Sequence, residues 1–215
     1  MSLKPYKTLL RDAQDEFIVN KSRFIGHGRP CETEEEALAF LGEMRAKYKD
    51  ATHNCYAYII GPNMGVMRYS DDGEPGGTAG MPIIEVMKAR GVTNAAVVVT
   101  RYFGGVLLGA GGLVRAYSQG AAAALNAAGV GVMHPTARYL MEVSYPMLGR
   151  IDFFLKDMPV RVEDKSFTDV ITYTLTVRCA DEADFLAKLT NASEGTVSPL
   201  KCEEVYLAWP EEDAP

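Results

Sequence analysis

The sequence lacks the features that mark several large classes of protein. Its four cysteines are widely spaced and form no CxxC pair. This argues against a zinc knuckle or a disulfide scaffold and fits reduced thiols. No apolar run approaches the roughly 18–20 residues that span a bilayer, and the first residues lack the apolar stretch of a signal peptide. We therefore expect a cytoplasmic globular protein that makes no membrane contact.

Acidic residues are missing from one long segment, since no Asp or Glu occurs between Glu85 and Glu142. The segment contains the cations Lys88, Arg90, Arg101, Arg115 and Arg138, although the net charge of the chain is −6. Such a window would create a local positive field on an acidic protein. Another explanation stays open, because buried strands and helices also exclude carboxylates.

A glycine-rich loop at 104–112 follows a predicted buried strand (95–100) and precedes a predicted Ala-rich helix (113–128). Glycine lets the backbone turn its N–H groups toward a ligand, and a helix N-terminus favours anions. The expected anion or nucleic-acid contacts are Arg101, Gly104, Gly105, Gly109, Gly111, Gly112 and Arg115. The spacing fits neither a Walker A nor a Rossmann motif, so we expect no nucleotide cofactor. A tight turn in which helix and sheet backbones touch would also need these glycines.

Two further groups of residues are secondary candidates. The loop 70–80 contains the candidates Asp71, Asp72, Glu74 and Thr78. Its carboxylates would suit Mg²⁺, but they equally suit turn caps or pairing with Arg68 or Arg101, and we expect no metal site. His53 shares one face of a predicted strand (53–60) with Cys55 at roughly 6–7 Å, too far for direct proton transfer. We therefore expect neither residue to be catalytic.

The pattern along the chain predicts two domains of the α+β class, at 1–132 and 136–210, with 129–135 as a linker. In the first domain, Thr33 and Glu36 form a capping box before a helix, and another helix covers 81–90. The second domain reads β-α-β-β-α-β, the order of a ferredoxin-like fold. It begins with a strand at 138–145, in which Tyr139, Met141, Val143 and Tyr145 share one face, and a helix from Pro146. A hairpin joining 160–164 to 170–179, a helix from an Asp181 N-cap through Leu189, and a strand at 200–208 follow.

Three stretches resemble the signature of the YigZ/IMPACT family, in the same order and with close spacing. They are Ala51–Tyr58 (ATHNCYAY), Asp71–Gly80 (DDGEPGGTAG) and Val97–Tyr117 (VVVTRYFGGVLLGAGGLVRAY), and Lys21–Phe24 (KSRF) fits as well. The match covers most of residues 17–130. One departure is Gly76, where the family pattern has Ser. This departure puts in doubt any role of a hydroxyl at that position.

The resemblance implies an N-terminal domain like the fourth domain of elongation factor G and the GHMP kinases, followed by a ferredoxin-like domain. It also implies a role in translation, since eukaryotic relatives bind a partner in the amino-acid-starvation pathway. Our leading hypothesis is a non-enzymatic binding protein that contacts RNA or the ribosome through the glycine-rich loop and its flanking arginines. The alternatives are a phosphotransferase or hydrolase that uses the same loop with a metal in the acidic loop, and a regulator that binds only protein partners.

Overall fold

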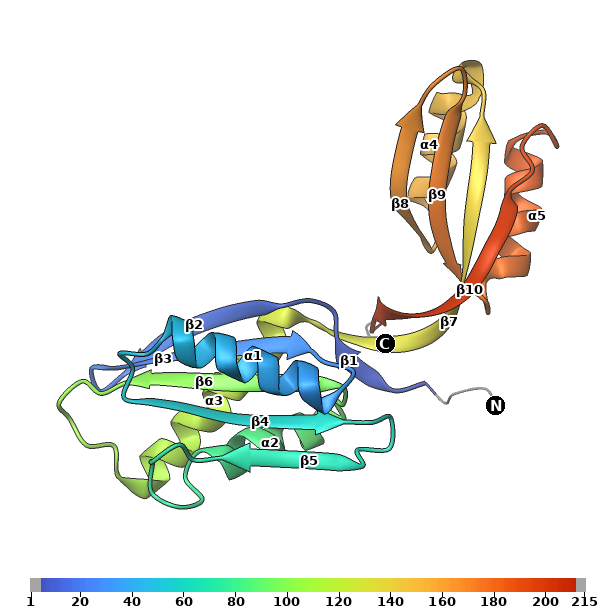
Figure 1. Cartoon of the computed structure of the whole chain (residues 1–215). Coiled ribbons are helices and arrows are strands. Elements are labelled where there is room, and N and C mark those ends of the chain that lie inside the picture. Colours follow the sequence, from blue (N-terminus) through green and yellow to red (C-terminus); the bar gives the residue numbers. More distant parts are fainter. Residues whose placement is uncertain (1–4, 212–215) are drawn as a thin grey trace. The chain divides into compact units, whose positions relative to one another are not determined.

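The computed structural model describes residues 5–211, which form two compact units (Figure 1). The first unit contains the chain up to Met133 together with a short return from Ala208, and the second contains His134–Leu207. Each unit combines helices with a β-sheet, and the chain has five α-helices in its described part. The α+β class predicted from the sequence is therefore confirmed.

The first unit is built on an antiparallel sheet with the strand order β2-β3-β6-β4-β5. The strands are β2 (Ala13–Val19), β3 (Ser22–Pro30), β4 (His53–Ile60), β5 (Val66–Ser70) and β6 (Ala95–Tyr102), and a short β1 (Lys7–Leu9) pairs with β7 (Val130–Val143). Strand β6 lies in the middle of the sheet and is buried from Ala95 to Arg101. The apolar run in the sequence therefore predicted this interior strand correctly.

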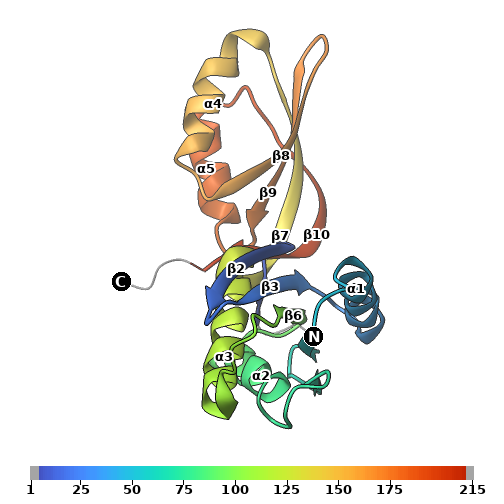
Figure 2. The same ribbon diagram turned by 90° about the vertical axis from the view of Figure 1, so that its left-hand side faces the viewer.

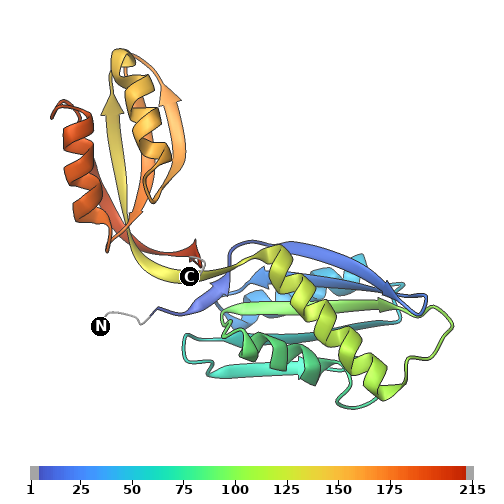
Figure 3. The same ribbon diagram turned by 180° about the vertical axis from the view of Figure 1, so that it is seen from behind.

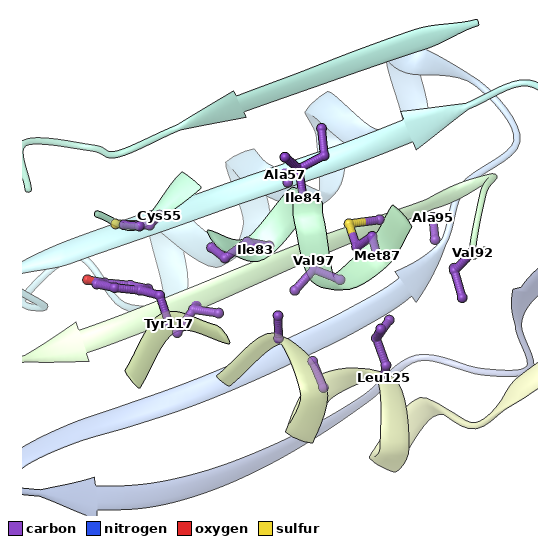
Figure 4. Close-up of a cluster of buried hydrophobic side chains, with 14 of the residues drawn as sticks. Cys55, Ala57, Ile83, Ile84, Met87, Val92, Ala95, Val97, Tyr117 and Leu125 are labelled. Carbon is purple, nitrogen blue, oxygen red and sulfur yellow. The ribbon is translucent and has the colours of Figure 1, made fainter. Parts of the chain in front are cut away.

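Helices cover both faces of this sheet (Figure 2). Helix α1 (Glu34–Lys47) packs on one face, and α2 (Gly80–Ala89) and α3 (Gly109–Ala128) pack on the other. Because side chains alternate along a strand, β4 contributes to both cores. Its Cys55, Ala57 and Ile59 join the core under α2 and α3, whereas Tyr58 and Ile60 face α1. Figure 4 shows Cys55 and Ala57 in the first of these cores, with Tyr117 of α3 beside Cys55.

The capping box predicted before α1 is half formed. The Thr33 hydroxyl accepts the backbone N–H of Glu36 at 3.2 Å, as predicted. The Glu36 carboxylate instead accepts the backbone N–H of Glu32 at 2.7 Å. Both bonds still satisfy backbone donors at the start of the helix.

Helix α3 begins at Gly109, four residues before the predicted start at Leu113. Glycine has a low helix propensity, so the run Gly109-Ala-Gly-Gly112 looked like loop in the sequence although it forms the first turn. The helix lies close against the sheet (Figure 3). A Cβ on Gly26 of β3 would stand 2.1 Å from the carbonyl oxygen of Gly120. Glycine at position 26 therefore sets the distance between α3 and the sheet.

We predict that Gly26→Ala destabilises the protein by about 1–3 kcal/mol or more, because the added methyl group meets backbone atoms that have no room to move. Gly42→Ala is the matched control, since a Cβ on Gly42 in α1 has no neighbour within 4 Å. The control should be neutral or stabilising by up to about 1 kcal/mol. Urea unfolding of both variants measures the difference. Equal stabilities would show that the close contact at Gly26 is not a constraint.

The second unit has the element order β-α-β-β-α-β. After β7 come the 3₁₀ helix η1 (Tyr145–Met147), α4 (Leu148–Lys156), β8 (Val160–Phe167), β9 (Ile171–Arg178), α5 (Glu182–Ala192) and β10 (Leu200–Pro210). The sheet path runs β7-β9-β8, and β10 pairs with β7. Residues of both helices, such as Ile151 and Phe185, pack with Tyr139, Met141 and Val143 of β7 in one core.

Three local predictions for this part of the chain are met only in part, although the boundary between the two units, after Met133, does fall within the segment 129–135. The segment 129–135 is not an irregular linker, because Val130–Val132 already pair with β1 as the start of β7; Gly129, with a φ of 70°, does end α3 as predicted. Strand β7 ends at Val143, so Tyr145 lies in η1, is half exposed, and does not continue the strand face of Tyr139 and Met141. Asp181 occupies the N-cap position of α5, but its carboxylate accepts from Nε of Arg178 at 2.5 Å and not from the helix backbone.

One buried histidine makes the stability of the first unit depend on pH. His27 of β3 is 2% exposed, and its ring lies 4.9 Å from that of Tyr48. Burial, reinforced by the nearby charge of Lys47, lowers the pKa of His27 from 6.5 to about 4. The folded protein therefore holds the neutral ring over a pH range in which the unfolded chain binds a proton.

The stability that depends on neutral His27 is complete above pH 6.5 and falls as the pH drops toward 4. We predict that the wild-type protein loses about 2 kcal/mol more than a His27→Gln variant between pH 7 and pH 5. Urea unfolding of both proteins at the two pH values measures this difference. Parallel losses in both would show that His27 does not titrate as its burial implies.

Candidate functional site

A cleft of about 430 Å³ opens beside the start of α3. Its lining joins regions that are far apart in the sequence: His53 begins β4, Glu74 comes from the loop before α2, Arg101 ends the buried part of β6, and Gly109 begins α3. Three of the segments that the sequence singled out therefore meet at one place. The chemistry of the site depends on how their side chains pair.

Glu74 lies at the centre of this arrangement. Its side chain is almost fully buried, and its Oε1 accepts from Nη1 of Arg101 at 2.6 Å and from the hydroxyl of Tyr117 at 2.7 Å. Nε2 of His53 lies 3.8 Å from the same oxygen. A buried carboxylate is tolerated only when charged and polar groups pair with it in this way. Burial also raises the pKa of the Tyr117 hydroxyl, which keeps it a donor.

Arg101 is held inside this cluster, with 5% of the residue exposed. Besides its ion pair, the guanidinium lies 5.5 Å from the ring centre of Phe24 and 5.4 Å from that of Phe103. Its Nη2 is 3.5 Å from the hydroxyl of Ser22, and its Nε has no hydrogen-bond partner within the part of the chain that the structure describes. The expected contact of Arg101 with an anion stays a prediction, and the geometry gives the side chain a clear structural role as well.

Arg115 lies apart from Arg101. It is exposed on α3 and lines a second cleft of about 240 Å³ together with Asn20, Gly112 and Gln119. Leu108 lines both clefts, so they flank the two sides of the same first turn of α3. The structure therefore does not bring the two predicted arginines into one cleft.

The positive field expected from the acid-free window is mostly cancelled by acids that lie outside it in the sequence. Lys88 pairs with Glu85, Arg101 with Glu74, and Arg138 with Glu163 and Glu203. Arg90 donates to the side-chain oxygen of Asn126 at 3.1 Å. Among the residues from 5 to 211, Arg115 is the cation of this window for which the structure records no ion pair or side-chain hydrogen bond.

The carboxylates of the acidic loop bind different partners rather than one shared centre. Asp71 accepts the backbone N–H groups of Gly77, Ala79 and Gly80 at 2.8–3.0 Å and so caps the start of α2. Burial alone would raise the pKa of Asp71, but these three hydrogen bonds outweigh it and lower the pKa below its usual range.

The other candidates of this loop are also engaged. Asp72 accepts the backbone N–H of Asn54 at 2.6 Å, and the buried Thr78 hydroxyl donates to the carbonyl of Pro75 at 2.6 Å. Within the described residues, one group of metal-ligating side chains lies close together elsewhere, at Cys179, Glu182 and Glu204. The amine of Lys201 lies 2.9 and 2.7 Å from those two carboxylates, so the amine already pairs with both.

His53 and Cys55 are oriented by the same loop. Nδ1 of His53 lies 2.8 Å from the carbonyl oxygen of Asp72, which fixes a proton on Nδ1 and directs Nε2 toward Glu74. The Cys55 thiol donates to the carbonyl oxygen of Asp71 at 3.0 Å and is fully buried. Burial raises the pKa of this thiol to about 12, so it is not a nucleophile at neutral pH.

The five glycines of the loop 104–112 have different structural roles. A Cβ on Gly104 would meet the backbone of Lys21 at 2.0 Å, so this glycine allows two backbones to touch. Gly105 and Gly109 adopt φ angles of 82° and 68° with open space around them. Gly111 and Gly112 lie in the first turn of α3. Among residues 5–211, no side chain forms a capping hydrogen bond at the N-terminus of this helix, and its first turn contains no acidic residue.

Two members of the cluster, Tyr117 and Ser22, were not predicted as site residues from the sequence. Neither residue was given a role of its own. Both lie within the quoted stretches, since Ser22 follows Lys21 in KSRF and Tyr117 ends the third stretch. Their presence in stretches that carry the family resemblance was therefore the signal by which Ser22 and Tyr117 could have been predicted.

Comparison with known proteins supports a common origin for these stretches. The model of the Impact N-terminal domain matches residues 20–125, and that of a domain of unknown function (DUF1949) matches residues 141–196. The IMPACT family member YvyE of Bacillus subtilis (strain 168) is 36% identical over 95% of this chain and 94% of its own length. The IMPACT family member YigZ of Escherichia coli (strain K12) is 35% identical over 86% of this chain and 92% of its own.

The chain belongs to the IMPACT family.

A solved structure, described as the crystal structure of an hypothetical protein, agrees with this assignment. It is 32% identical, has a TM-score of 0.59, and matches 94% of this chain and 99% of that one. In this IMPACT family member, every stretch that carries the family resemblance contributes to the cluster around Glu74. These stretches are 21–24, 51–58, 71–80 and 97–117. No helix of the described part has the length and apolar character needed to cross a membrane.

We predict that Glu74→Ala destabilises the protein by about 3–5 kcal/mol, because it leaves the buried guanidinium of Arg101 without a counter-ion. Glu85→Ala is the control, since it breaks the exposed pair with Lys88 and should cost less than about 1 kcal/mol. Chemical unfolding with circular dichroism measures both. A loss at Glu74 as small as that of the control would mean that the cluster does not hold the site together.

Proposed function

We propose that this IMPACT family member is a translation-linked regulatory binding protein that contacts RNA through the start of α3. The observation that carries the proposal is the uncapped N-terminus of α3, which begins at Gly109 between two clefts and has no acidic residue in its first turn. Such a terminus offers backbone donors and a partial positive charge to a phosphate. Arg115, in the second turn of α3, adds a full positive charge to the same surface.

Family membership supports a regulatory role, and the resemblance to eukaryotic relatives in translation control points to RNA or the ribosome as the partner. A cytoplasmic location follows from such a partner. We also propose the fold analogies with elongation factor G and the GHMP kinases, and a ferredoxin-like second domain within 136–210. The order β-α-β-β-α-β, with β10 beside β7 and both helices in one core, supports the second of these.

In this proposal Arg101 positions the contact surface and does not make the main contact itself. Its ion pair with Glu74 fixes the end of β6, from which the loop 103–108 departs. The hydroxyl of Ser22 accepts the backbone N–H of Gly104 at 3.2 Å and anchors the next residue of that loop. The backbone amides of 109–112 and the side chain of Arg115 are then left to face the phosphates.

An enzyme that handles phosphate is the second candidate. The observation that favours it is that His53 and Glu74 line the same cleft as the start of α3. The hydrogen bonds of Asp71 and Asp72 speak against the metal-binding loop that this candidate needs. Thermal shift with Mg²⁺ and a panel of nucleotides separates the two candidates. Stabilisation by a mononucleotide with Mg²⁺ would favour the enzyme.

We predict that Arg115→Ala weakens binding of a short fluorescent RNA several-fold and lowers the slope of log affinity against log salt by about one unit, because one phosphate contact is lost. Fluorescence anisotropy between about 50 and 200 mM salt measures both quantities. Arg90→Ala is the matched control, since Arg90 is bonded to Asn126 near the opposite end of α3. If the two variants bind RNA as the wild-type protein does, the start of α3 is not the contact surface.

A further inference from the structure

An aromatic side chain stands in the wall of the cleft beside the start of α3. Phe103 follows β6, and 45% of the residue is exposed. Its backbone N–H donates to the Thr52 hydroxyl at 3.0 Å, and the Arg101 guanidinium lies over its ring. The ring is therefore fixed at its base while its outer part stays accessible. Exposed aromatic rings held in this way serve as stacking platforms for nucleobases in proteins that bind single strands.

The rest of the cleft suits a flat ring with polar edges. Pro75, Leu108 and Leu113 supply apolar walls, and Leu107, 86% exposed, stands at the rim. A volume of about 430 Å³ falls within the range of roughly 300–1,000 Å³ that small-molecule sites usually have.

Polar side chains also line this cleft, among them Thr52, His53 and Arg101. Nδ1 of His53 is engaged by a backbone carbonyl, so its Nε2, which faces the Glu74 carboxylate at 3.8 Å, beyond hydrogen-bond distance, is the ring atom left to accept a proton donor. The Thr52 hydroxyl accepts from the backbone and keeps its own proton to donate. Behind them the nine-tenths buried Arg101, which also lines the cleft, has an Nε without a partner. These groups match the hydrogen-bonding edge of a base.

The positive charge near the cleft favours a ring that is attached to a phosphate over an apolar peptide side chain. The first turn of α3 separates this cleft from the smaller one that contains Arg115, and Leu108 belongs to both. A base in the larger cleft would therefore place its own phosphate over the first turn of α3 and toward Arg115. An apolar peptide side chain would use the walls but neither the uncapped helix terminus nor the arginine.

We propose that this cleft binds an unpaired nucleobase of single-stranded RNA, stacked on Phe103, with the adjoining phosphate at the start of α3. The proposal rests on the proposed RNA-binding function and adds to it the form of RNA that is recognised. A paired base is held inside its helix and cannot enter a cleft, so duplex RNA lacks this contact. Single strands should bind more tightly than duplexes of the same sequence.

The test compares variants at position 103 by anisotropy, with single-stranded and duplex forms of one RNA. Phe103→Leu keeps the apolar volume but removes the aromatic face, and we expect it to weaken single-strand binding about ten-fold while leaving duplex binding unchanged. Phe103→Trp restores stacking, and its indole emission should be quenched by the single strand. Phe153→Leu is the matched control, because Phe153 is an exposed phenylalanine of α4 in the second unit.

The outcomes separate this inference from the proposed function. If RNA binding depends on Arg115 and salt but Phe103→Leu binds both RNA forms as the wild-type protein does, the base site is wrong and the function stands. Equal affinity of the wild-type protein for single strands and duplexes also overturns the base site. If no RNA binds at all, both proposals fail. Circular dichroism of each variant confirms that a lost affinity is not lost folding.

Discussion

The buried ion pair between Glu74 and Arg101 is the interaction on which the candidate site depends. It joins the loop before α2 to the end of β6, and its carboxylate also binds Tyr117 of α3 and faces His53 of β4. In an interior of low polarity a charge that loses its partner is costly, so these four elements are locked together. The exposed loop 103–108 starts two residues after Arg101. The ion pair of Arg101 with Glu74 therefore determines where this loop, which forms one wall of the cleft, begins.

Much of the fold could be predicted because it is specified by local patterns. The apolar run of β6 and the alternation along β4 each reflect a periodicity of the backbone that the sequence displays directly. The start of α3 and the strand at Val130 were missed because tertiary partners decide them. Glycines in the first turn of α3 oppose helix formation locally, and β1, far away in the sequence, turns the supposed linker into a strand.

The sequence predicted the position of the candidate site more accurately than the pairing of its side chains. The quoted stretches do converge, but charge counts alone cannot tell whether an arginine faces solvent or a buried acid. The acid that pairs with Arg101 lies 27 residues earlier, outside the acid-free window, and only the antiparallel sheet brings the two together. Tyr117 had no predicted role beyond its place at the end of the third stretch, because nothing local to α3 shows that its hydroxyl reaches a carboxylate 43 residues earlier.

This division between interior and surface limits how the protein can recognise a partner. Arg101 is buried in the cluster around Glu74 and adds little charge to the surface. Within the described chain, the surface at the start of α3 therefore presents backbone N–H groups, the unpaired Arg115, and apolar side chains such as Phe103 and Leu107. Few full charges imply a shallow salt dependence. In the proposed RNA site, stacking and backbone contacts tolerate any base, so the availability of an unpaired nucleotide would select a partner before the polar groups of the cleft act on its base.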